Sequence, residues 1–240
     1  MLWYKGWLET RFKVVFLLSF AVFPIVLTLA VGHHLTTGRQ HAPTAAELAE
    51  AENGFGYFGM YYSIIPLFLA GSGIKTEYGS RKRGVSGSTC FTLSLPVSRF
   101  RLFATRAGLG MLETVGILAI APYAIWVAFV EPGDPPVSLS NLFALWVSLS
   151  AGTSVFYSVG ILLSTFMDEV YRNWVSLFGV ALLLALLSKV RLLAPLNVFR
   201  AMGLPLFPPH SFPWAGMGIS LGVAAVLGFA ALRIVQTREY

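Results

Sequence analysis

The sequence predicts an all-α integral membrane protein, and three observations carry this prediction. Hydrophobic residues make up 56% of the 240 residues and charged residues only 12%, whereas soluble domains carry about 25% charged residues. Long apolar segments recur along the whole chain, and the Lys and Arg residues are concentrated in a few of the stretches between them. A chain of this length has no aqueous core large enough for so much apolar surface, so we expect the bilayer to cover it.

Six segments are apolar over the length that a spanning helix needs, which is about 20 residues. The third and fourth exceed this length, so we expect them to tilt or to project beyond the bilayer. Residues 1–12 mix Trp, Tyr and Phe with charged side chains, which predicts a short interfacial helix before the first span. We expect one transmembrane domain over residues 1–240, with spans at about 13–31, 54–74, 104–130, 139–166, 174–194 and 214–235.

The positive charges predict the orientation of these spans. An even number of spans places both termini on one side, and basic residues favour the cytoplasmic side. With the termini inside, the outer loops hold four of the 17 Lys and Arg residues, namely Arg39, Lys189, Arg191 and Arg200. Seven of the 17 lie between the second and third spans, at Lys75, Arg81, Lys82, Arg83, Arg99, Arg101 and Arg106.

An unusual segment, 195–213, precedes the last span. It holds five prolines among apolar residues, so no continuous helix can pass through it. We expect a re-entrant element that dips into the outer leaflet, with its backbone covered by protein or water.

The segment GSTCFTLSLPVSRFRLFATR (87–106) resembles the membrane subunits of type-2 ABC transporters, the ABC-2 permease family of bacterial exporters. It is similar to the family's small Gly/Thr turn, an apolar run ending in Pro-Val-Ser-Arg, and a basic residue that opens span three. Pro96, Ser98 and Arg99 match this pattern position by position, and the order of features matches along the whole chain. Many members carry an acidic residue directly before the turn, where this chain has Val85-Ser86-Gly87, and Glu77 is the candidate for that part from further away.

The resemblance implies a subunit of a larger machine in the bacterial plasma membrane, with both termini cytoplasmic. Two such permease subunits, identical or different, would pair above two cytosolic ABC ATPase subunits. ATP and Mg would bind those partners, since this chain has no GxxxxGK[ST] phosphate loop and hence no expected cofactor or catalysis of its own. Coupling would pass through residues 75–101 and the loop 167–173. The implied contact residues are Glu77, Arg81, Thr89, Leu95, Pro96, Ser98, Arg99, Arg101, Asp168 and Glu169.

Glu113 is the clearest ionisable residue within a predicted span. An unpaired carboxylate in hydrocarbon costs several kcal/mol, so this side chain must face protein or water, or be protonated. Two roles are open: a pathway or interface residue, or a helix–helix hydrogen bond with Ser or Thr. Ser154, Tyr157 and Ser158 share a polar face of span four and are candidate partners.

Other features have plain structural interpretations. The basic loop orients the chain and can touch anionic lipid, and no basic-aromatic module predicts nucleic-acid binding despite a net charge of +6. His33, His34 and His210 lack metal-site spacing, so we expect no metal. Gly218-x-x-x-Gly222 predicts close helix packing, either within the subunit or at a dimer seam.

Two alternative functions come from other classes. An intramembrane six-span protease would need a Ser nucleophile and a His base facing each other within the membrane, but every His lies in an expected outer loop or at a span end. A membrane assembly factor without transport is the other alternative, and genomic pairing with an ATPase would argue against it.

Overall fold

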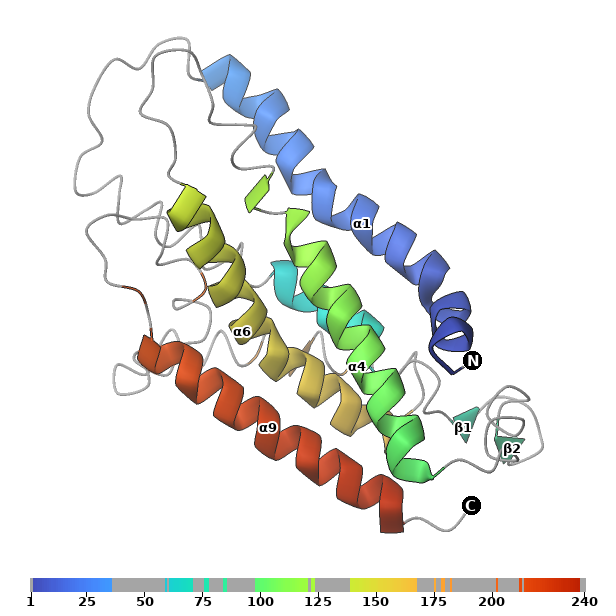
Figure 1. Ribbon diagram of the computed structural model, residues 1–240. Coiled ribbons are helices and arrows are strands. Elements are labelled where there is room, and N and C mark those ends of the chain that lie inside the picture. The colour runs from blue at the N-terminus through green and yellow to red at the C-terminus, as the bar shows by residue number, and fades with distance from the viewer. Residues whose placement is uncertain are drawn as a thin grey trace.

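The computed structural model is helical apart from one small hairpin (Figure 1). Its long helices are α1 (Leu2–Leu35), α4 (Arg99–Leu118), α6 (Leu139–Ser164) and α9 (Trp214–Thr237). A further helical segment spans residues 61–69. Two short strands, β1 (Thr76–Glu77) and β2 (Gly84–Val85), pair antiparallel. The structure describes residues 2–35, 59, 61–70, 76–77, 84–85, 98–120, 122–123, 139–167, 175, 178–179, 182, 202, 212 and 214–237.

The four long helices lie along one common direction (Figure 1). α1 and α4 run one way, whereas α6 and α9 run the other way. The first residues of α1 and α4 therefore lie at the same end as the last residues of α6 and α9, and the β1–β2 hairpin lies there too. We call this end the hairpin end, and the opposite end, which holds Leu35, Leu118, Leu139 and Trp214, the far end.

Helix α1 corrects the prediction of a separate interfacial helix over residues 1–12. It is one continuous helix of 34 residues, which corresponds to about 51 Å. Its first turns pack on α4: Thr10 is buried, and the ring of Trp3 lies 3.7 Å from where a Cβ on Gly108 would stand. Because its first turns pack on α4, the N-terminal part of α1 continues in line with the rest of the helix and does not form a separate interfacial helix.

Helix α4 begins earlier than the predicted third span, at Arg99 instead of residue 104. Ser98 is its N-cap, with extended backbone and a side chain that accepts the Arg101 N–H. Hydropathy predicts where the apolar part of the helix begins. The N-cap Ser98 determines where the helix itself begins. The helix ends at Leu118, and residues 124–130 of the predicted span lie outside the described residues.

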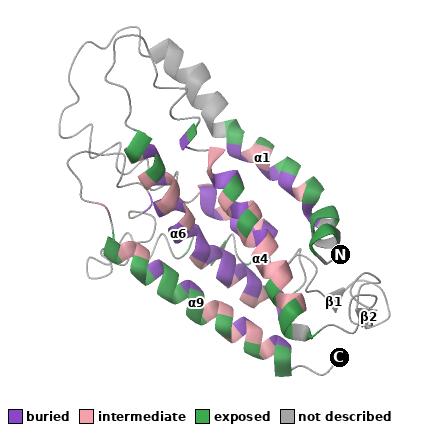
Figure 2. Cartoon of the chain, viewed as in Figure 1, coloured by how far each residue is buried: buried purple, intermediate pink, exposed green. Residues whose placement is uncertain are grey.

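Helices α6 and α9 begin at the residues predicted for the fourth and sixth spans. Among the described residues, these two helices are long and apolar enough to cross a membrane. α6 is buried on most sides, whereas α9 buries only a narrow stripe of Ser220, Ala224, Ala231 and Val235 and exposes large apolar side chains (Figure 2). Of the predicted fifth span, only Val175, Phe178, Gly179 and Leu182 are described, and all four are helical.

The short helical segment 61–69, with Ala70 at its end, is the most enclosed part of the chain that the structure describes. Seven of the ten residues 61–70 are buried. The segment touches α6 so closely that a Cβ on Gly160 would stand 2.6 Å from the Cβ of Ala70. It also touches α4, since a Cβ on Gly110 would stand 3.3 Å from the Leu69 carbonyl oxygen. Glycine at both positions therefore lets the segment lie against two long helices at once.

Gly160→Ala tests this close packing. The new Cβ would overlap Ala70, and we expect the free energy of unfolding in detergent to fall by about 1–3 kcal/mol, as for overpacked cores. Adding Ala70→Gly removes the opposing Cβ and should restore most of the loss. Gly228→Ala on α9 is the control, because no atom of the described residues lies within 4 Å of its Cβ position. Equal thermal shifts for Gly160→Ala and Gly228→Ala would contradict the packing.

Candidate functional site

The hairpin end brings together parts of the segment that the sequence marks for coupling. β1 and β2 pair with Thr76 opposite Val85 and Glu77 opposite Gly84. The six residues 78–83, which include Arg81, connect the two strands in the sequence. Sequence reasoning did not predict this hairpin. The alternation of polar and small residues in 76–85 gives no apolar period that would indicate strands.

The Lys and Arg residues of the four long helices all lie toward the hairpin end. Those of α1 lie within its first twelve residues, those of α4 within its first eight, and that of α9 in its last turns. Two of these cations lie over aromatic rings, Arg11 over Phe12 at 4.9 Å and Arg233 over Phe229 at 5.0 Å. The seven residues are Lys5, Arg11, Lys13, Arg99, Arg101, Arg106 and Arg233.

The start of α4 is built by Ser98. Its Oγ accepts the backbone N–H of Arg101 at 3.3 Å, and the Ser98 carbonyl accepts the N–H of Leu102 at 3.1 Å. The first turn of α4 contains no acidic residue. Arg101 is exposed, and Arg99 is the first helical residue. Arg99 and Arg101 therefore add positive charge at the N-terminus of α4, where the helix dipole is already positive.

The structure places only some of the coupling residues implied by the resemblance. Glu77 lies in β1, Ser98 caps α4, and Arg99 and Arg101 lie in its first turn. The remaining predicted contact residues lie outside the described residues, namely Arg81, Thr89, Leu95, Pro96, Asp168 and Glu169.

Glu113 pairs with α1. The hydroxyl of Thr10 donates a hydrogen bond of 2.6 Å to Oε1 of Glu113. Oε2 is buried and has no hydrogen-bond partner within the described part of the chain. Lys13, one turn beyond Thr10 on α1, interacts electrostatically with this carboxyl group. The carboxyl group therefore links α4 to the first turns of α1.

The expectation that span four supplies the partner of Glu113 is wrong. In α6, the Ser154 hydroxyl donates to the Ala151 carbonyl at 2.6 Å, within its own helix. The Tyr157 hydroxyl donates to the Ala107 carbonyl of α4 at 2.7 Å. Sequence periodicity finds the polar face of a helix, but it does not show which neighbouring helix that face meets.

Ser148 joins α6 to the proline-rich segment 195–213. Its Oγ lies 3.1 Å from the carbonyl oxygen of Met202 and 2.9 Å from that of Leu145, so the single hydroxyl proton is shared between the two acceptors. Met202 is 0% exposed. Ser148 is nine residues beyond the start of α6, so this contact lies about 14 Å along the helix from the far end. The hydrogen bond between Ser148 and Met202 could not be predicted from the sequence, because the two residues lie 54 positions apart.

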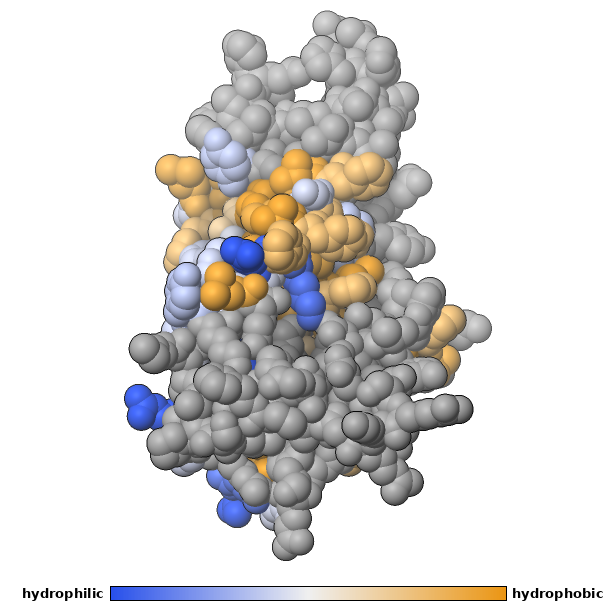
Figure 3. Space-filling view, turned by 90° about the vertical axis from the view of Figure 1, so that its right-hand side faces the viewer, coloured by the Kyte–Doolittle hydropathy of each residue, from blue (hydrophilic) through white to orange (hydrophobic). Residues whose placement is uncertain are grey.

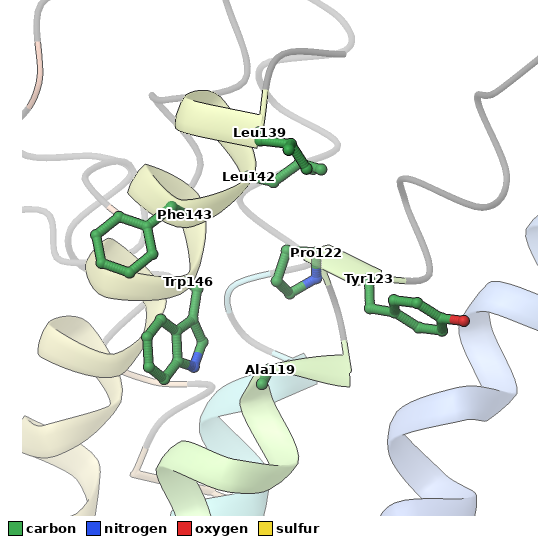
Figure 4. A pocket seen from close by; sticks show the side chains of 7 residues that line it. All are labelled: Ala119, Pro122, Tyr123, Leu139, Leu142, Phe143 and Trp146. Carbon is green, nitrogen blue, oxygen red and sulfur yellow. The ribbon is translucent and has the colours of Figure 1, made fainter. Parts of the chain in front are cut away.

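A pocket of about 380 Å³ opens at the far end between α4 and α6 (Figure 4). The Trp146 indole N–H is already bonded to the Val115 carbonyl at 3.0 Å, and the Trp146 ring lies 5.7 Å from that of Phe143. None of the described residues that line this pocket is charged. Its lining residues are Ala119, Pro122, Tyr123, Leu139, Leu142, Phe143 and Trp146. The pocket can hold an uncharged apolar group, and its lining offers no acid–base pair.

Among the described residues, the small-residue motif of α9 has no close neighbour. A Cβ on Gly218 or Gly222 would meet none of their atoms within 4 Å, so packing of this motif within the subunit or at a dimer seam stays a prediction. The surface seen in Figure 3 gathers apolar side chains in its upper middle, with some hydrophilic side chains among them and others at the edges and below.

Comparison with protein-family models, with curated proteins and with solved structures finds no match for this chain. Among the described residues, no group of three His, Cys, Asp or Glu side chains is placed to hold a metal ion. The described residues thus form a helical bundle with a basic hairpin end, an interhelical carboxyl group and an apolar pocket at the far end.

Thr10→Val tests the contact between α1 and α4. It removes the hydroxyl donor and leaves the Glu113 carboxyl group buried without its partner, so we expect a loss of about 1–3 kcal/mol in the free energy of unfolding. Thr10→Val combined with Glu113→Met removes both polar groups and should cost less than Thr10→Val alone. Thr105→Val is the control, because the exposed Thr105 hydroxyl bonds only the carbonyl of Arg101 in its own helix. A double variant less stable than Thr10→Val would contradict the pairing.

Proposed function

We propose that this protein is the permease subunit of an ATP-driven exporter of the ABC-2 type. In this proposal six helices cross the plasma membrane and the hairpin end faces the cytosol. Two copies, or this chain and a second permease, form the pathway above two ATPase subunits. The chain itself supplies no phosphate-binding loop, so ATP is bound and hydrolysed by the partner.

The segregation of charge is the observation that carries the proposal. The hairpin, the start of α4 and the end of α9 lie at one end of the bundle, together with every Lys and Arg of the four long helices. In membrane proteins the cytoplasmic side holds the excess of basic residues. The exposed apolar side chains of α9 support a position in the bilayer, because lipid can cover them.

The start of α4 supports an acidic cytosolic partner. Arg99 and Arg101 add positive charge where the helix dipole is already positive, and no acidic residue of the first turn compensates it. A basic helix start of this kind is stabilised by an acidic surface set against it. The β1–β2 hairpin stands at the same end, so both could meet one partner. We assign this role to an ATPase subunit.

The contact of Met202 supports a re-entrant element before the last span. Its carbonyl bonds Ser148 well inside α6, and its side chain is fully buried. A backbone carbonyl at membrane depth requires such a donor from protein. The apolar pocket, also toward the far end, favours an uncharged apolar substrate or substrate moiety.

Reversal of the charges at Arg99 and Arg101 tests the coupling role. Arg99→Glu with Arg101→Glu should leave the spans inserted, because many other basic residues still orient the chain. Copurification of the ATPase should fall by about tenfold or more, since like charges would then face each other across the contact. The measurement is ATPase recovery in mild detergent, with substrate-stimulated hydrolysis in the same preparation.

Arg233→Glu with Arg238→Glu is the matched control for this experiment. It reverses the same number of charges near the end of α9, outside the coupling segment. ATPase recovery and stimulation should stay close to those of the wild type. If the two double variants behave alike, the start of α4 is only an orienting anchor and the coupling role must be withdrawn.

Orientation can be measured with the single native cysteine, Cys90. An impermeant maleimide should label Cys90 only after the cells are permeabilised, since the segment 75–101 is placed inside. In a Cys90→Ser background, Asp134→Cys should be labelled in intact cells, because it lies in an expected outer loop. Labelling of Cys90 in intact cells would overturn the orientation.

A further inference from the structure

Helix α1 contains a proline at position 24 and continues as a helix to Leu35. Proline has no backbone N–H, so the carbonyl of Phe20, four residues earlier, loses its usual donor within the helix. In an apolar environment an unpaired carbonyl is costly and needs another donor. The turn before Pro24 is therefore the weakest point of α1. Its Phe20 carbonyl needs a hydrogen-bond donor from another segment.

Two consecutive tyrosines of the segment 61–69 lie at this turn. The Tyr61 hydroxyl donates to the Phe20 carbonyl, the one left without its donor by Pro24. Its ring also stacks on the Phe20 ring, with centroids 4.2 Å apart and planes 6° from parallel. The Tyr62 hydroxyl donates to the next carbonyl, that of Ala21, at 3.1 Å.

The two tyrosines hold this turn of α1 from two directions. Their rings lie 5.6 Å apart at 77° to each other, and the Tyr62 side chain is fully buried. The same segment is wedged against α4 and α6 at Gly110 and Gly160. Only five residues, 71–75, separate Ala70 from the strand β1. A displacement of the hairpin would therefore have to pass through only these five residues to reach the segment that binds the weakest turn of α1.

We propose that Tyr61 and Tyr62 form a latch on a proline hinge in α1. While their hydroxyls bind the carbonyls of Phe20 and Ala21, residues 24–35 are held in line with the first part of the helix. When the segment 61–69 moves, the hydroxyls leave and the far half of α1 can reorient. The source of that movement rests on the proposed function, namely the ATPase acting on the hairpin end, whereas the latch itself does not.

Hydrogen exchange of the full chain in nanodiscs tests the latch without ATP or partner. Tyr61→Phe keeps the stacked ring but removes the donor, so exchange of amides in residues 20–35 should accelerate by about tenfold, as for loss of one ordinary hydrogen bond. Amides of residues 2–15 should be unaffected. Tyr4→Phe, at an exposed tyrosine of the same helix, should change neither region.

The decisive comparison uses Pro24→Ala, which restores the missing N–H. In that background the Phe20 carbonyl has its own helical donor, so Tyr61→Phe should alter exchange by less than about twofold. Pro24→Ser provides the same N–H and serves as a second background. An effect of Tyr61→Phe that is equal with and without Pro24, or absent with Pro24, would show that the tyrosine only packs, and would overturn the latch.

The link to the ATPase is tested separately, with the copurified complex and a non-hydrolysable ATP analogue. The analogue should accelerate exchange of residues 20–35 in the wild type but not in Pro24→Ala. If the variant comparison holds and this acceleration is missing, the latch stands and its coupling to ATP is rejected. If no ATPase copurifies at all, the proposed function fails instead.

Discussion

Side-chain donors that bond backbone carbonyls of neighbouring segments hold this structure in register. An apolar surface gives helices no preferred position along one another, because lipid contacts it as well as another helix does. A hydrogen bond to a particular carbonyl fixes that position. Tyr157 thus sets α6 against α4 at Ala107, and Trp146 sets the same pair again at Val115, 2.7 and 3.0 Å from their acceptors.

The same rule explains why the segment 61–70 occupies the centre. The segment meets three long helices, namely α1, α4 and α6. Glycines on α4 and α6 admit its backbone, and its tyrosines reach the carbonyls of α1. Because the segment continues toward the hairpin, the most enclosed element lies next in sequence to the part proposed to meet the ATPase. A central element with this position is well placed to pass a displacement to several helices.

The helical class and the starts of two long helices could be predicted from the sequence, because hydropathy is averaged over many residues. The starts of α6 and α9 match the predicted spans, and the first predicted span lies within α1. What failed depended on single contacts. The start of α4 follows a cap at Ser98, and the unbroken α1 follows the packing of its first turns on α4.

The candidate site divides in the same way. Glu113 could be identified from the sequence, because a carboxyl group within an apolar segment is evident from the residue type alone. Its partner Thr10 lies 103 residues away in the chain, and no pattern within a helix indicates which neighbour it meets. The role of Pro24 was missed for the same reason, since the proline matters only together with the hydroxyls of a distant segment.

The two ends of the bundle require different surroundings, and this difference sets the orientation in the proposed function. The hairpin end concentrates cations that need water, phosphate or acidic protein around them. The far end presents aromatic and aliphatic side chains around an apolar pocket. In the proposed function this polarity sets the orientation in the bilayer, with the basic end toward the anionic cytoplasmic leaflet. The proline turn of α1 lies between these ends, and the Tyr61 and Tyr62 hydroxyls bind it there, so the proposed latch stands between the basic end and the far half of α1.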